Sequence, residues 1–176
     1  LGVFMLAAST SDLTREVAPI PFLWVLPLAI YLTTFIFSFD KPQWYFRPLY
    51  VVLFLLSLAA SGYSIHGVDD PYLGIEIALY GVTLFSACML CHGEMVRRRP
   101  PNDRLTEFYL LLALGGALGG FLASVISPLI FSEYFEYETG LSLVILVVGY
   151  AIISSLPRFR QSLGVAVIVL SAVVLT

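Results

Sequence analysis

Residues 105–131 read LTEFYLLLALGGALGGFLASVISPLIF, a run long enough to cross a membrane as a helix and rich in closely spaced glycines. Four of these glycines form two overlapping pairs with a spacing of four residues, Gly115 with Gly119 and Gly116 with Gly120. On a helix such pairs let a neighbouring backbone approach closely, so the spacing predicts a helix-packing seam. The alternative, a glycine loop that cradles phosphate, needs a preceding strand, whereas the flanks here are apolar and of helical length.

The composition is that of an integral membrane protein. Hydrophobic residues make up 59% of the chain and charged residues 12%, against roughly 25% charged residues in a soluble domain. Several runs reach the length of about 20 apolar residues that a membrane helix needs, and none alternates as a membrane strand does. We therefore expect an all-α, polytopic transmembrane helical bundle that contacts the lipid bilayer and does not bind nucleic acid.

The apolar runs predict five complete spans, at residues 17–39, 48–65, 71–96, 105–131 and 140–156. Residues 1–8 are interpreted as the end of an earlier helix, residues 9–16 as a polar connector, and residues 161–176 as a further partial helix. Because both ends fall inside apolar runs shorter than a span, we expect residues 1–176 to be a single transmembrane domain and a fragment of a longer chain.

Basic residues divide unevenly between the loops. Only Arg15 lies on one side of the predicted membrane. The other eight fall in alternate loops, which share the opposite side: Lys41, Arg47, Arg97, Arg98, Arg99, Arg104, Arg158 and Arg160. The positive-inside rule makes those loops cytoplasmic, with Arg97, Arg98, Arg99 and Arg104 as topology anchors. The opposite face is acidic, which would favour a cation or a cationic partner, or which simply reflects how readily acidic loops are translocated.

Two carboxylates stand eighteen residues apart in the third span. Five helical turns place Glu76 and Glu94 on one face, about 27 Å apart along the axis, with Tyr80 and Thr83 between them. Since ionisable residues inside spans usually face the bundle or water, these four residues are candidates for a cation path. The alternative is that Glu76 reaches headgroup water and Glu94 pairs with an arginine three or four residues further on.

The sequence Cys88-Met-Leu-Cys91-His92 matches the attachment motif of c-type haem. Its position is at the predicted cytoplasmic end of an apolar helix, where two small cysteines packed among helices are the more ordinary explanation. His92 lacks a second histidine nearby in the sequence, so we predict no metal and no cofactor. No serine, histidine and acid set converges either, and the sequence indicates no catalytic site.

Two stretches resemble the membrane region of bacterial spermidine-synthase-like integral membrane proteins. They are DLTREVAPIPFLWVLPLAIYLTTFIFSFD, from residue 12, and LCHGEMVRRRPPNDRLTEFYLLLALGGALGGFLASVISPLIF, ending at residue 131. Within them His92, Gly93 and Glu94 match an HGE element, and Leu105, Thr106, Phe108 and Tyr109 match an LTxFYL element. The resemblance implies the bacterial inner membrane and a transporter-like fold. It also implies that aminopropyltransferase activity would require a separate synthase domain, which these residues do not contain.

Two functions are therefore open. One is a transporter-like domain that handles polyamine or another organic cation, as the resemblance, the acidic loops and the aligned glutamates suggest. The other is a non-catalytic structural or accessory subunit, packed through the glycine seam against other helices of the same chain or of a larger membrane complex.

Overall fold

The computed structural model describes residues 1–16, 25–67, 73–130 and 136–155. Within these ranges the chain is helical, without a strand. The long helices are α1 (Gly2–Glu16), α2 (Val25–Asp40), α3 (Arg47–Gly67), α4 (Leu73–Arg97), α5 (Leu105–Phe121) and α7 (Glu136–Ser155). Two 3₁₀ turns, Pro42–Trp44 and Asn102–Arg104, precede α3 and α5.

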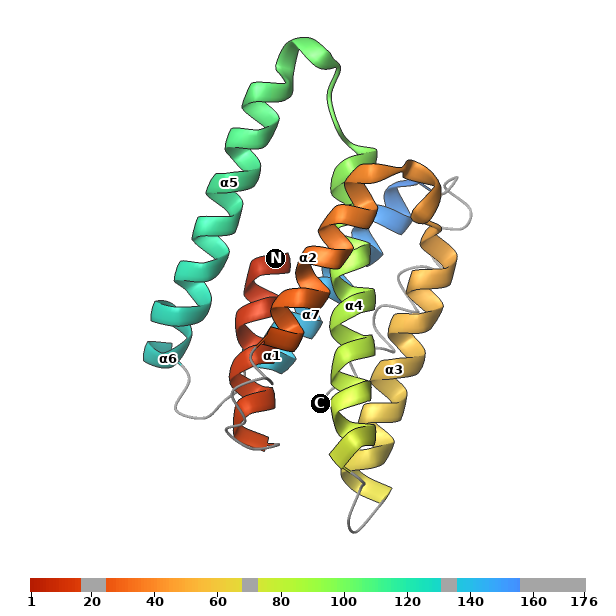
Figure 1. The fold of residues 1–176 in the computed structure, drawn as a ribbon, viewed down its shortest axis with the longest axis vertical. Coiled ribbons are helices and arrows are strands. Elements are labelled where there is room, and N and C mark those ends of the chain that lie inside the picture. Colours follow the sequence, from red (N-terminus) through yellow and green to blue (C-terminus); the bar gives the residue numbers. More distant parts are fainter. Residues whose placement is uncertain (17–24, 68–72, 131–135, 156–176) are drawn as a thin grey trace.

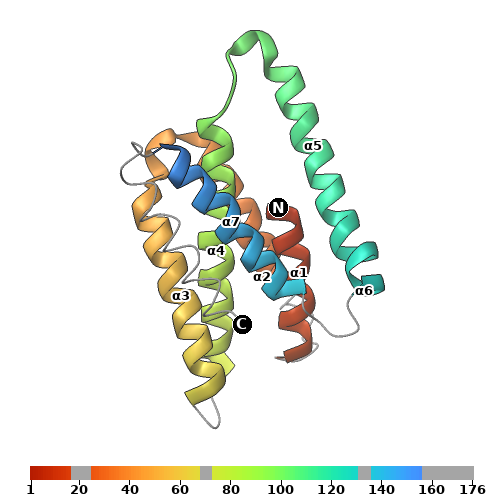
Figure 2. The ribbon, with the colours of Figure 1, turned by 180° about the vertical axis from the view of Figure 1, so that it is seen from behind.

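Helix α4 lies at the centre of the bundle. It packs between α2 and α3, while α7 crosses behind it and α1 lies between the lower parts of α2 and α5 (Figures 1 and 2). Its middle, residues 84–90, supplies much of the core, where Leu84, Ala87, Met89 and Leu90 are at most 1% exposed. Met5 of α1 and Val144 of α7 pack into the same core.

The connector expected at residues 9–16 is wrong, because these residues continue α1 from the apolar segment before them. The polar side chains are compatible with a helix: Thr10 donates from Oγ1 to the carbonyl of Leu6 at 2.7 Å. Leu13 is 2% exposed and packs against Leu26 and Tyr80, so the buried face of α1 extends past the last apolar run. Tertiary burial, which a hydropathy reading does not include, keeps this segment helical.

The boundaries of the central span also differ from the expectation. Helix α5 ends at Phe121, a π-helical stretch follows at Leu122–Ile126, and a short α6 covers Ser127–Ile130. Ser124 donates to the carbonyl of Gly120 at 2.8 Å where the wider turn begins. The end of the expected span at residue 131 lies outside the described residues.

By length and hydropathy, two helical segments could cross a membrane, Gly74–Arg97 and Asn102–Ile126. The apolar helices Val25–Asp40, Arg47–Ser61 and Tyr137–Ile153 are shorter. The structure therefore does not support five complete spans in the described residues. All three of the shorter helices border segments outside those residues: 17–24 before α2, 68–72 after α3 and 156–176 after α7, the last including the expected C-terminal partial helix.

Candidate functional site: the His92-Gly93-Glu94 cluster

The last turns of α4 carry the most connected polar cluster that the structure describes. Glu94 is buried there, with a side chain 8% exposed, although it lies only three residues before the end of α4. Arg47, the first residue of α3, approaches it from the side, and Tyr45 lies in the connection just before α3. Residues almost fifty positions apart in the sequence thus form one site.

Arg47 binds Glu94 with both ends of its guanidinium group. Its Nε lies 2.6 Å from Oε1 and its Nη2 lies 2.7 Å from Oε2, a bidentate arrangement. Arg97 stands 3.5 Å from Oε1 but is half exposed, so it contributes less. The expected pairing of Glu94 with an arginine on its own helix is therefore secondary to a pairing with α3, which sequence spacing does not reveal.

The hydroxyl of Tyr45 donates a third hydrogen bond to Glu94, at 2.9 Å from Oε1. Burial and this bond raise the pKa of Tyr45, so its phenol stays protonated and remains a donor. The ring stacks on Tyr50 with centroids 5.9 Å apart, and Tyr50 in turn donates to the carbonyl of Trp44 at 3.0 Å. These contacts fix the short connection between α2 and α3 against the end of α4.

Gly93 faces the ring of Tyr45 directly. A Cβ at this position would overlap the ring, so a glycine is required for the tyrosine to reach Glu94. The role of Gly93 is therefore steric: the absence of a side chain makes room for the ring of Tyr45.

His92 points to the other side of α4, toward α2. It is 4% exposed, and its Nδ1 lies 3.2 Å from Oγ1 of Thr34. Tyr31 and Phe35 meet the imidazole ring edge-on, with centroids 5.0 Å and 5.4 Å away. Thr34 uses its single hydroxyl proton toward the carbonyl of Tyr31 at 2.7 Å, so the Nδ1–H of His92 is the donor to Thr34.

His92, Gly93 and Glu94 together connect α4 to both of its neighbours. His92 engages α2, Glu94 engages α3, and Gly93 admits the tyrosine from the connection between them. In chemical terms the cluster contains a carboxylate whose two oxygens both accept hydrogen bonds from Arg47 or Tyr45, and a histidine with one of its two ring nitrogens hydrogen-bonded to Thr34.

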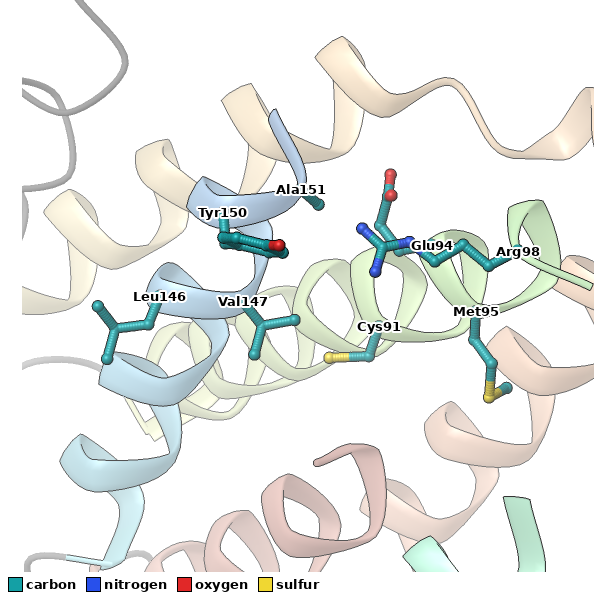
Figure 3. A pocket seen from close by; sticks show the side chains of 8 residues that line it. All are labelled: Cys91, Glu94, Met95, Arg98, Leu146, Val147, Tyr150 and Ala151. Carbon is teal, nitrogen blue, oxygen red and sulfur yellow. The ribbon is translucent and has the colours of Figure 1, made fainter. Parts of the chain in front are cut away.

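Figure 3 shows the open side of this cluster, a pocket of about 380 Å³ between α4 and α7. Cys91, Met95 and Arg98 line it from α4, and Val147 and Tyr150 line it from α7. Glu94 also borders the pocket, but its carboxylate is bound by Arg47 and Tyr45.

The structure does not bring Glu76 close to Glu94, because they lie at opposite ends of α4. Between them, Thr83 is fully buried and donates to the carbonyl of Leu79, while Tyr80 donates to Asp12 of α1 at 2.7 Å. The sequence reading missed this last contact because it placed Asp12 in a connector. The cation path through these residues stays a prediction.

The four glycines of α5 lie at different distances from α1. A Cβ at Gly119 would be 3.4 Å from the backbone nitrogen of Phe4, and Cβ atoms at Gly116 and Gly120 would lie 3.6 and 3.7 Å from the side chain of Val3. Gly115 has open space around it. The backbones therefore approach most closely at Gly119.

The expected topology anchors lie together at one end of the bundle. Arg97 ends α4, Arg104 directly precedes α5, and the connection between these two helices is at the upper end in Figure 1; all four arginines are exposed. Arg158 and Arg160 lie outside the described residues.

The side chains of the haem-type motif, Cys88, Cys91 and His92, lie in different environments around α4. Cys88 is buried and Cys91 is partly buried, both as free thiols, and His92 is held by Thr34. Across the parts of the chain that the structure describes, no group of three or more His, Cys, Asp or Glu residues could hold a metal ion. The expectation of no cofactor is not tested by this.

Comparison with known proteins gives no relative: no family model, no curated protein and no solved structure matches this chain.

Proposed function

We propose that these residues form a non-catalytic, membrane-embedded helical domain with a structural or accessory role in a larger membrane protein or complex. The observation that carries this proposal is the bidentate pairing of Glu94 with Arg47. The carboxylate expected to attract a cation is neutralised by its own chain, and it joins α3 to α4 instead.

The distribution of apolar side chains supports membrane insertion. Helix α2 buries Thr34 and Ser38 and exposes a stripe of large apolar residues: Val25, Leu28, Leu32 and Ile36, which are 46–61% exposed. Such a helix would be unfavourable in water, whereas lipid solvates the apolar stripe and the bundle satisfies the hydroxyls. The Asn102–Ile126 segment is only 11% buried at a mean hydropathy of 2.0, which favours lipid around it as well.

We extend this proposal to five crossings of the bacterial inner membrane, with the arginine-rich end on the cytoplasmic side. The clustering of basic residues at one end of the bundle supports it. Single cysteines at Asn102 and at Glu138, in a background without Cys88 and Cys91, would react with an impermeant reagent from opposite sides of the membrane. Labelling of both from the same side would overturn the arrangement.

A transporter-like domain for polyamine or another organic cation is the second candidate. It is favoured by a short line of buried polar side chains at the α2–α4 contact: Thr34 and Ser38, four residues apart on α2, and His92 of α4, which meets Thr34. In a bundle that faces lipid, such a line is where a polar path would run.

One experiment separates the two candidates. The purified chain is titrated with spermidine at constant ionic strength, and its melting temperature is compared with that of Glu76→Gln. A structural role predicts no saturable shift in either protein. A saturable shift in the wild type that Glu76→Gln weakens would overturn the structural proposal and establish cation binding, because a polycation needs the opposite charge.

A further inference from the structure

We propose that the pocket between α4 and α7 binds the headgroup phosphate of an anionic phospholipid at Arg98, with one acyl chain along α7. This inference rests on the membrane embedding proposed above. It concerns Arg98 and its apolar surroundings, which the Glu94 cluster does not use.

The pocket has a polar end and an apolar floor. On α4, Cys91, Glu94, Met95 and Arg98 follow a spacing of three, one and three residues, which places them on one helical face. The guanidinium of Arg98 extends back along α4 into the pocket, on the side of Tyr150 (Figure 3). At about 380 Å³ the pocket is within the size range of ligand sites in proteins.

The charge at this end of α4 is positive after internal pairing. Two guanidinium groups, those of Arg47 and Arg97, lie within 4 Å of the Glu94 carboxylate, and Arg98 adds a third positive charge at the same pocket. Arg47 and Arg97 approach that carboxylate, whereas Arg98 forms no ion pair with any residue in the described parts of the chain. A phosphate would thus meet an arginine whose charge is not already compensated.

The apolar lining identifies the occupant as a lipid. Leu146, Val147 and Tyr150 on α7 are 48–68% exposed at the pocket, and they continue away from Arg98 along the helix. A free phosphate would gain nothing from this surface, whereas an acyl chain would bury it. Basic pockets between membrane helices on the cytoplasmic side are a known setting for anionic headgroups.

The test is native mass spectrometry of the chain purified in mild detergent and titrated with phosphatidylglycerol or phosphatidylcholine. We expect one retained phosphatidylglycerol, and a loss of at least tenfold in its apparent affinity in Arg98→Gln, the factor of one charge-assisted hydrogen bond. The matched control Arg104→Gln removes an exposed arginine from the same end of the bundle and should change the affinity less than twofold.

A second variant tests the acyl-chain half of the site. Val147→Trp fills the exposed floor of the pocket without touching Arg98, so it should weaken phosphatidylglycerol binding, while the control Val82→Trp should not. Equal retention of phosphatidylcholine, equal losses in Arg98→Gln and Arg104→Gln, or equally tight binding of glycerol phosphate would each overturn the inference. Carbonate extraction of membranes that contain the wild type distinguishes failure of the lipid site from failure of the proposed function. Release of the chain by carbonate would contradict the membrane embedding, whereas a retained chain without phosphatidylglycerol binding would contradict only the lipid site.

Discussion

Replacing Glu94 by glutamine tests whether the Arg47–Glu94 pair stabilises the bundle. Glutamine keeps one acceptor oxygen but presents an NH₂ group to Arg47, so at least one charge-assisted hydrogen bond is lost. Such a bond is worth about 1.5–3 kcal/mol. The guanidinium of Arg47 is then left without its counter-ion at a site where it is only 17% exposed.

The cost should lie somewhat below that of breaking a fully buried ion pair, about 3–5 kcal/mol, because Arg47 retains some contact with solvent. We therefore expect Glu94→Gln to destabilise the chain by about 2–4 kcal/mol. At roughly 2–4 °C per kcal/mol for a chain of this size, the melting temperature should fall by roughly 4–16 °C. Differential scanning fluorimetry in detergent would measure the fall.

Two further variants make the measurement specific. Glu107→Gln removes an exposed carboxylate from the first turn of α5 and should leave the melting temperature nearly unchanged. The double variant Arg47→Met with Glu94→Gln leaves no buried charge unpaired, so it should be less destabilised than the sum of the single variants, by about 1–3 kcal/mol. A fall no larger than that of Glu107→Gln, or strict additivity, would refute the reasoning.

Three other outcomes follow from single contacts. Gly93→Ala would push a methyl group into the ring of Tyr45 and should cost about 1–3 kcal/mol, whereas Gly74→Ala, where the space is open, should be neutral or slightly stabilising; equal melting temperatures would contradict the proposed packing. Gly119→Leu should separate α5 from α1 and lower stability, while Gly115→Leu should be tolerated, as thermal unfolding would show; similar effects at both positions would mean that this face does not pack. The pKa of Tyr45 is higher in the folded chain than in the unfolded chain, where it is about 10, so the contribution of Tyr45 to stability is complete below pH 10 and is lost as the pH rises above that value. Stability measured from pH 8 to 11 should therefore fall less steeply in Tyr45→Phe than in the wild type. Parallel curves for the two proteins would contradict this prediction.

The difference between what sequence and fold reveal is clearest at Glu94. Its helical position, its place beside Arg97 and its presence in an apolar segment are local properties, so they could be read from the chain. Its partners Arg47 and Tyr45 come from another helix and a connection, and nothing in the local spacing distinguishes Arg47 from the other basic residues of the same end. The helical register offered Arg97 or Arg98, and the structure places Arg97 3.5 Å from Glu94 and half exposed.

The sequence by itself determined the all-helical class, the apolar segments and the gathering of basic residues between them, because hydropathy and helical period act over neighbouring residues. Only the tertiary structure decided that residues 9–16 are helical, that Asp12 meets Tyr80, and that Gly119 rather than Gly115 meets α1. These outcomes depend on which helix packs on which face. That choice is set by contacts between distant residues, which the order of residues along one helix does not contain.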